Sequence, residues 1–190
     1  MYSFFAYLSR MRYITRWNLM RNTVPEDISQ HSLQVAMLAH GLALIRKRVF
    51  RVDCDPERAT VLAVYHEAGE TITGDLPTPI KYFSPEIRNA YAAVEKVAEK
   101  KLLEMLPEVL REDFAPLMHP EDEAMWPLVK AADKLSAYLK CVEELKAGNR
   151  EFEKAYLSIE KELRASDLPE VAYFLEHFAP AYHLTLDELN

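Results

Sequence analysis

Apolar residues recur at helical spacing along most of the chain. Leu33, Met37, Leu38, Leu42 and Ile45 follow this spacing, which predicts a helix that begins at a Ser29 cap. The Asp-Pro-Glu triplet at residues 55–57 predicts another helix start, because a capping Asp precedes a proline and an acidic first turn. The hydrophobic pattern therefore favours helices over strands.

Caps, prolines and glycines mark the remaining segments in the same way. Two segments break the helical pattern: residues 22–28 are polar, and Gly74 with two prolines predicts a stiff, non-helical turn at 73–81. We therefore predict an all-α fold in which residues 1–190 form a single domain. Further helices are expected at residues 3–13, 84–106, from 107 onward, 121–147 with a kink near Pro127, 150–164 and 168–178.

Composition and charge narrow the class of protein. Of the 190 residues, 49% are apolar, 28% are charged and only 4 are glycine, as expected of one helical globular domain. The net charge of −7 argues against binding a nucleic-acid polymer, and no segment is long and apolar enough to predict a membrane span. Cys54 and Cys141 form no motif and the N-terminus lacks signal-peptide features, so we expect a reduced, cytoplasmic protein.

One segment indicates chemistry, because His66 and Glu67 are adjacent on the third predicted helix and Glu70 follows one turn later. Together with His31 and Asp133, the pair could supply two nitrogen and two oxygen ligands to a divalent cation and leave coordination positions open. The spacing of these four residues is too wide for a compact ligand signature, and adjacent His and Glu are common on exposed helix faces. From the residues alone, a metal site and an ordinary surface pair both remain open.

Several motifs, taken in order with their flanks, resemble one family of enzymes. They are FFAYLSR at 4–10, RWNLMR at 16–21, HSLQVA at 31–36, YHEA at 65–68, TGDLPTP at 73–79, KYF at 81–83 and AYLKC at 137–141. The chain resembles the HD-domain phosphohydrolases and, within them, the bacterial 5′-deoxynucleotidase (YfbR-like) family. The similarity runs along nearly the whole chain, and the 74–79 turn is specific to this subfamily. The resemblance implies a single HD-domain helical bundle.

The resemblance places the family's metal ligands on His31, His66, Glu67 and Asp133. It implies a divalent ion such as Co²⁺, Mn²⁺, Fe²⁺ or Zn²⁺, among which a mixed nitrogen and oxygen ligand set does not choose. Glu67 departs from the family, in which an Asp follows the second His. Its carboxylate can ligate the same ions, but the extra methylene requires the helix or the metal to shift. We therefore expect metal binding with an altered affinity or metal preference.

The resemblance also implies the substrate side of the site. Arg16 falls on the residue that orients the phosphate, and Trp17 on a residue beside the sugar, where an indole could leave no space for a 2′-hydroxyl. Asp75 could accept a hydrogen bond from the 3′-hydroxyl, in a turn that prolines hold rigid. The residues expected to contact substrate are Arg16, Trp17, Glu67, Asp75, Leu76, Pro77, Thr78 and Asp133.

These assignments imply a metal-dependent phosphomonoesterase, a 5′-deoxynucleotidase that converts deoxyribonucleoside 5′-monophosphates to deoxynucleoside and phosphate. We expect Arg16 to align the phosphoryl group, and Glu70 to act as general acid or base because it lies one turn from the ligands. Two alternatives remain: a nucleotide-binding protein with a degenerate site, which Glu67 supports, and an HD phosphohydrolase that acts on another nucleotide. The resemblance further implies a homodimer and a small deoxynucleotide substrate. Charge and hydropathy predict neither a nucleic-acid polymer nor a membrane as a partner.

Overall fold

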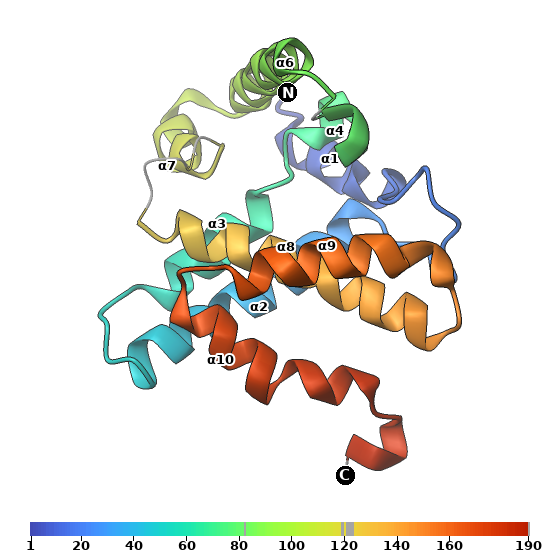
Figure 1. Ribbon diagram of the computed structural model, residues 1–190. Helices are drawn as coiled ribbons and strands as arrows, with labels where there is room; N and C mark the ends of the chain where they lie inside the picture. The colour runs from blue at the N-terminus through green and yellow to red at the C-terminus, as the bar shows by residue number, and fades with distance from the viewer. Residues whose placement is uncertain (82, 119, 121–123, 190) are drawn as a thin grey trace.

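The computed structural model describes residues 1–81, 83–118, 120 and 124–189, and its regular structure is helical (Figure 1). Extended pairing within these residues is limited to one isolated antiparallel bridge between Thr15 and Asp27. The predicted all-α fold is therefore confirmed. Among the helices of the described ranges, none combines the length and the hydropathy needed to cross a membrane.

Three helices form the centre of the molecule: α2 (Ile28–Arg48), α3 (Pro56–Tyr65) and α8 (Trp126–Lys146). Helix α2 packs against both α3 and α8, and α3 also contacts α8. Many of the buried positions on these helices are alanine, which lets neighbouring helix axes approach closely. The core residues of these three helices with no exposed surface are Ile28, Val35, Ala39, Leu42, Ala43, Ala59, Leu62, Ala63, Leu128, Val129, Ala132, Leu135, Leu139 and Cys141.

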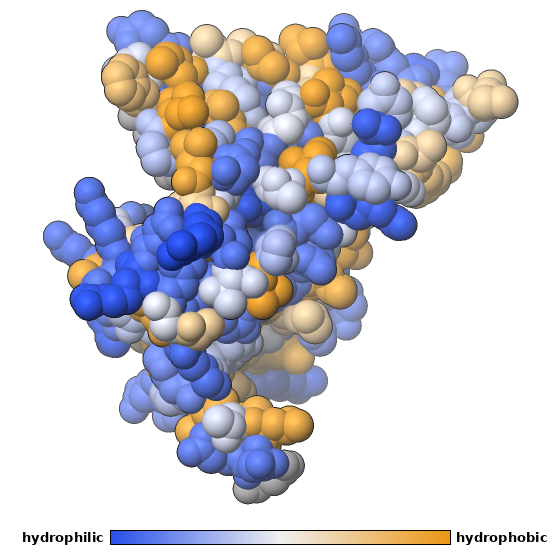
Figure 2. All heavy atoms as spheres, turned by 90° about the vertical axis from the view of Figure 1, so that its right-hand side faces the viewer, coloured by the Kyte–Doolittle hydropathy of each residue, from blue (hydrophilic) through white to orange (hydrophobic). Residues whose placement is uncertain are grey.

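Shorter elements surround this centre. In Figure 1, α1, α4, α6 and α7 lie above it and α10 lies below it, while α9 packs against α8. The face drawn in Figure 2 is largely hydrophilic in its middle, and apolar side chains gather higher up, at the level of α1, α4 and α6. The surrounding elements are α1 (Phe4–Leu8), η1 (Ser9–Tyr13), α4 (Glu70–Thr73), α5 (Thr78–Lys81), α6 (Pro85–Glu104), α7 (Glu108–Met118), η3 (Arg150–Phe152), α9 (Glu153–Arg164), α10 (Pro169–His177), η4 (Ala179–His183) and η5 (Leu186–Leu189).

Helix α2 begins earlier than the sequence pattern predicts, because Asp27 rather than Ser29 is its cap. The Asp27 carboxylate accepts hydrogen bonds from the backbone N–H groups of Ser29 (2.8 Å) and Gln30 (3.0 Å). The Gln30 side chain in turn accepts from the backbone N–H of Asp27 (3.2 Å), which completes a capping box. This cap fixes the first turn of α2, and His31 lies in that turn.

The sequence pattern predicts that His66 and Glu67 lie on a helix, and this prediction is wrong. Helix α3 ends at Tyr65, and residues 66–69 form a turn that leads into α4. Short i→i+3 hydrogen bonds hold the turn, from Ala68 N–H to the Tyr65 carbonyl (2.9 Å) and from Glu70 N–H to the Glu67 carbonyl (3.0 Å). The α-helical i→i+4 hydrogen bonding is therefore interrupted at the pair.

Two prolines have consequences other than those predicted. The 73–81 turn was predicted to be non-helical, but Thr78–Lys81 forms α5, because a proline is tolerated in a first turn, where its missing N–H has no helical partner. Pro127 likewise occupies the first turn of α8 and produces no kink, since α8 begins at Trp126. The predicted start of that helix, Glu121, lies outside the described residues.

The cap of α2 gives a test of this local assignment. Asp27→Ala is expected to lower the free energy of unfolding by about 1 kcal/mol, because two backbone N–H groups lose their acceptor. Ser29→Ala is the matched control and should cost less, since the backbone N–H of Ser29 keeps its bond to Asp27. Urea denaturation of the two variants measures the difference, and a larger loss in Ser29→Ala would contradict the assignment.

Candidate metal centre

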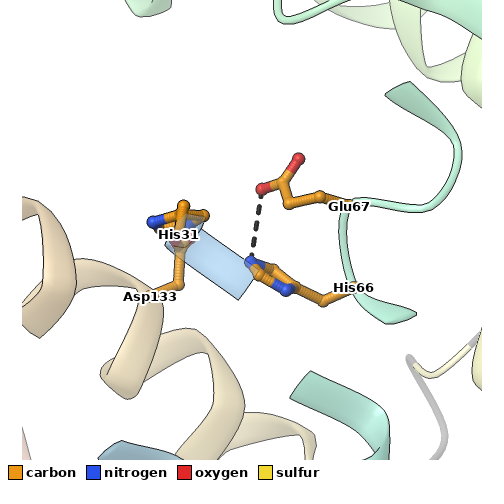
Figure 3. A group of neighbouring side chains, drawn as sticks. All are labelled: His31, His66, Glu67 and Asp133. Atoms are coloured by element: carbon orange, nitrogen blue, oxygen red, sulfur yellow. Dashed lines mark ion pairs between the residues drawn. The ribbon is translucent and has the colours of Figure 1, made fainter. Parts of the chain in front are cut away.

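Four side chains that are far apart in the sequence converge at the meeting point of the central helices (Figure 3). They are His31 from α2, His66 and Glu67 from the turn after α3, and Asp133 from α8. One potential ligand atom from each lies within 4.8 Å of those of the other three. The packing of α2 against α3 and α8 therefore brings together all four residues that the sequence singled out as metal ligands.

The hydrogen bond of His66 fixes its tautomer. Nδ1 lies 2.7 Å from the carbonyl oxygen of Ala63, one turn earlier in α3. A carbonyl oxygen can only accept, so Nδ1 carries the proton and Nε2 carries a lone pair. That Nε2 atom lies 3.3 Å from Oε1 of Glu67.

His31 reaches the same state through a chain of two hydrogen bonds. Ser136 Oγ donates to the side-chain oxygen of Gln34 (2.6 Å), so it accepts from Nδ1 of His31 at 3.2 Å. Nε2 of His31 is then unprotonated and lies 3.1 Å from Oδ1 of Asp133. No role was expected for Gln34 or Ser136 from the sequence, although each follows a candidate ligand by three residues on the same helix and so shares its face.

The cluster therefore presents two imidazole lone pairs to two carboxylates. The side chains of His31 and His66 are 0% and 2% exposed, and Nε2 of each is buried without a hydrogen-bond partner. Burial lowers the pKa of His66, which opposes a second proton on its ring despite the nearby carboxylates. Lone pairs and anionic oxygens at these distances repel unless a cation lies between them. Two imidazole nitrogens and two carboxylate oxygens are a suitable set for a divalent first-row metal, so the residues fit such an ion.

Glu67 reaches the cluster in spite of its longer side chain, because it extends from a turn rather than from a helix (Figure 3). Burial opposes ionisation of this carboxyl, but the hydrogen bond from Glu70 and the positive charge of Arg16 outweigh burial and lower its pKa. Glu67 is therefore ionised, as a metal ligand must be.

Arg16 supplies a fixed positive charge beside the cluster. Its Nη1 lies 3.7 Å from Oε1 of Glu67, its Nε lies 3.3 Å from Oε2 of Glu26, and its side chain is 14% exposed. Burial works against the charge, but Glu67, Asp133 and Glu26 outweigh it and raise the pKa of Arg16. A guanidinium held in this way is available to bind the oxygens of an anionic ligand.

Glu70 is the uncharged carboxyl of the group. Burial raises its pKa, and the negative charge of Glu67 and a hydrogen bond between the two side chains raise it further. Its Oε2 atom is buried without a partner. A proton-bearing carboxyl thus lies at the start of α4, next to the ligand cluster.

The other residues expected to contact substrate lie on two loops. Trp17 packs its ring on Phe152 with 5.2 Å between centroids, and the backbone carbonyl of Asp75 accepts from the side chain of Asn18 (3.5 Å). Burial raises the pKa of Asp75, whereas the charge of Arg16 lowers it, which places that carboxyl in the field of Arg16. Leu76 and Pro77 follow in a half-buried turn, and Thr78 begins α5, with its side chain outside the described part of the chain.

A family model described as 5′-deoxynucleotidase YfbR-like matches residues 3–182. The chain belongs to this family. It is 53% identical to a 5′-deoxynucleotidase of Cronobacter sakazakii, over 98% of this chain and 95% of that protein. It is 52% identical to the 5′-deoxynucleotidase YfbR of Escherichia coli, again over 98% of this chain and 95% of that protein. The resemblance inferred from the motifs is thereby confirmed.

Solved structures agree with the fold. An HD-domain phosphohydrolase from Listeria innocua superposes with a TM-score of 0.79 at 19% identity, covering 95% of this chain and 88% of that one. A cyanophage S-2L HD phosphohydrolase, bound to dA and one catalytic Zn²⁺ ion, superposes with a TM-score of 0.62 at 18% identity, covering 92% of this chain and 95% of that one. The predicted HD-type helical bundle is confirmed by these neighbours.

The ligand geometry predicts the metal content of variants. His66→Ala should reduce bound divalent metal from one ion per chain to background, because it removes one of two nitrogen ligands. Ser136→Ala should weaken binding by about 10–100-fold, because His31 loses the acceptor that orients its ring. His177→Ala, an exposed histidine of α10, is the control. Elemental analysis after dialysis against a chelator measures all three, and full metal retention in His66→Ala would exclude it as a ligand.

Proposed function

We propose that this chain is a metal-dependent 5′-deoxynucleotidase in which His31, His66, Glu67 and Asp133 hold the metal. The observation that carries the proposal is the pair of buried imidazole lone pairs facing two carboxylates, in a chain of the YfbR-like family. The relatives named above are 5′-deoxynucleotidases, and the cyanophage neighbour holds dA beside a catalytic Zn²⁺. The substrate is a deoxyribonucleoside 5′-monophosphate and the products are the deoxynucleoside and phosphate.

The metal, when bound, polarises the phosphate and lowers the pKa of the attacking water. Arg16 binds phosphate oxygens and holds the phosphoryl group in line with the attacking oxygen. Glu26 and Glu67 contact two sides of the guanidinium and limit its rotation. The positive charge of Arg16 also offsets the carboxylates, which would otherwise repel an anionic substrate.

Glu70 acts as the general acid and then as the general base of the reaction. Attack forms a bond from the water oxygen to phosphorus and breaks the bond from phosphorus to the 5′-oxygen, which must gain a proton while the water loses one. A carboxyl that burial and Glu67 keep protonated is suited to donate a proton to the departing 5′-oxygen. The carboxylate that remains can accept the water's proton, so the enzyme returns to its starting state.

Trp17 and Asp75 serve the sugar. The Trp17 ring, backed by Phe152, is a rigid wall that leaves no space for a 2′-hydroxyl. Asp75 accepts a hydrogen bond from the 3′-hydroxyl, and Tyr91 of α6 holds the preceding turn by donating to the carbonyl of Gly74 (3.2 Å). We propose that Leu76, Pro77 and Thr78 complete this side of the substrate pocket, and that Glu67 and Asp133 contact the phosphate as well as the metal.

The degenerate-site alternative rested on Glu67 alone. The carboxylate of Glu67 lies within the ligand cluster, so the substitution leaves a complete set of four ligands. This geometry supports an enzyme rather than a binding protein. From the resemblance we also propose a homodimer and a cytoplasmic location.

The decisive experiment compares dAMP with AMP across Mn²⁺, Co²⁺, Zn²⁺ and Mg²⁺. Phosphate release should require a metal, cease with a chelator, return when metal is restored, and be faster with dAMP than with AMP. Binding of dAMP without phosphate release under every metal would contradict the enzyme and favour a nucleotide-binding protein. Faster release from a deoxynucleoside di- or triphosphate would contradict the monophosphate assignment.

A single substitution tests the role of Glu70. Glu70→Gln keeps the shape of the side chain but cannot transfer a proton, so kcat with dAMP should fall by about 10²–10⁴-fold. Bound metal should stay at the wild-type level, because Glu70 is outside the ligand set. The exposed Glu57→Gln serves as control for handling and folding. Wild-type turnover in Glu70→Gln would remove Glu70 from the mechanism.

A further inference from the structure

A buried ion pair on α8 lies apart from the metal centre and takes no part in the mechanism above. Lys140 and Glu144 are one turn apart, with side chains 6% and 2% exposed, and their charged groups are in contact. Removing two charges from water costs several kcal/mol, and well-packed apolar residues can replace such pairs without loss of stability. The contacts of this pair indicate what it does instead.

Both charges bind the backbone of one distant loop. The Glu144 carboxylate accepts from the N–H groups of Thr23 (2.9 Å) and Val24 (3.3 Å), and Lys140 Nζ donates to the carbonyl of Val24 (2.5 Å). Asn149 takes part in the same contacts, because its side-chain amide donates to Glu144 (2.7 Å) and to the carbonyl of Arg21 (2.7 Å). We call the three residues Lys140, Glu144 and Asn149 the clamp. These contacts span more than a hundred residues of sequence.

The clamped loop is the one that carries Arg16 and Trp17. Its two ends are tied together, by Arg16 N–H to the Glu26 carbonyl (2.9 Å) and by Ile28 N–H to the Ile14 carbonyl (3.0 Å). Residues 17–24 are therefore the part of the loop farthest from its base, which we call the loop end, and the Lys140–Glu144 pair binds this loop end. The side chain of Asn22 links the clamp to Trp17 by donating to the Trp17 carbonyl (3.2 Å).

Trp17 needs such restraint for two reasons. Its φ of 55° lies in the left-handed region, which a bulky residue adopts only when its surroundings impose it. Its ring rests on Phe152, and the ring of Phe152 also faces Lys140, whose Nζ lies 5.7 Å from the ring centroid. Asn149 also accepts from Glu151 N–H (3.3 Å) in the short η3 helix that holds Phe152. The same pair therefore restrains both the backbone of Trp17 and the ring beneath it.

We propose that Lys140 and Glu144 are positioning residues for sugar selection, which hold Trp17 in the orientation that excludes a 2′-hydroxyl. They touch neither metal ligands nor substrate and act only through the 17–24 loop end and Phe152. The proposal rests on the proposed function, because it assigns to Trp17 the choice between deoxyribose and ribose.

The test compares two buried glutamates that differ in location. Glu144→Gln removes the charge that binds the loop. Glu170→Gln removes the charge that pairs at 2.6 Å with Arg46, which lies near the C-terminal end of α2. Both side chains are 2% exposed, so the two variants match in burial. Glu144→Gln should lower the ratio of kcat/KM for dAMP to that for AMP by at least about tenfold, whereas Glu170→Gln should leave the ratio unchanged.

A double-mutant cycle asks whether the effect passes through Trp17. In a Trp17→Ala background the ratio should already be low, and adding Glu144→Gln should change it no further. An equal drop in both backgrounds, an unchanged ratio in Glu144→Gln, or an equal drop in Glu170→Gln would each overturn the proposal. Lys140→Met provides a second variant, with the same expected drop, should Glu144→Gln fail to fold.

A measurement independent of turnover separates this proposal from the proposed function. The chain has 2 tryptophans, so Trp126→Phe leaves Trp17 as the fluorophore. In that background, Glu144→Gln should shift the Trp17 emission to longer wavelength and increase quenching by iodide, while Glu170→Gln should not. Unchanged emission in Glu144→Gln overturns the positioning role even if the enzyme is active. Absent phosphate release from the wild type, with the emission shift present, overturns the function and leaves the clamp intact.

Discussion

The packing of α2 against α3 and α8 is the constraint on which the rest of the structure depends. Alanines at the contact, such as Ala39, Ala63 and Ala132, have no exposed surface and let the three backbones approach closely. His31 in the first turn of α2 is thereby brought into contact with Asp133 of α8 and with the turn after α3. Loss of this packing would move the four side chains apart even if each of them were unchanged.

Burial also determines the chemistry of the ligands. Each histidine uses one ring nitrogen for a hydrogen bond inside the protein, to Ala63 or to Ser136, and so turns an unprotonated nitrogen toward the carboxylates. In the same space the pKa of Glu67 is lowered and that of Glu70 is raised, because burial and the charge of the first carboxylate both oppose a second negative charge. The turn after α3 and the first residue of α4 thus place a carboxyl of lowered pKa beside one of raised pKa.

The loop that carries Arg16 and Trp17, which we propose to contact the substrate, does not belong to the helical core. It is fixed at its base by the bridge between Thr15 and Asp27 and at the loop end by Glu144. Helix α8 therefore carries both Asp133, in the cluster of candidate metal ligands, and Glu144, three turns later, which binds the loop. This division explains how a mostly irregular segment can hold rigid groups against a substrate.

Hydrophobic spacing and local caps were enough to predict the helical class and most helix positions, and the motifs, through the family resemblance, pointed to the four residues that cluster as candidate metal ligands. The sequence pattern misplaced the start of α2 and set His66 and Glu67 on a helix, because capping boxes and tight turns depend on competing hydrogen bonds that spacing does not reveal. Only the tertiary structure decided which nitrogen of each histidine faces the cluster. It alone also decided that the carboxylate of Glu144 binds a loop more than a hundred residues away, because partners so distant in sequence meet only when the helices pack.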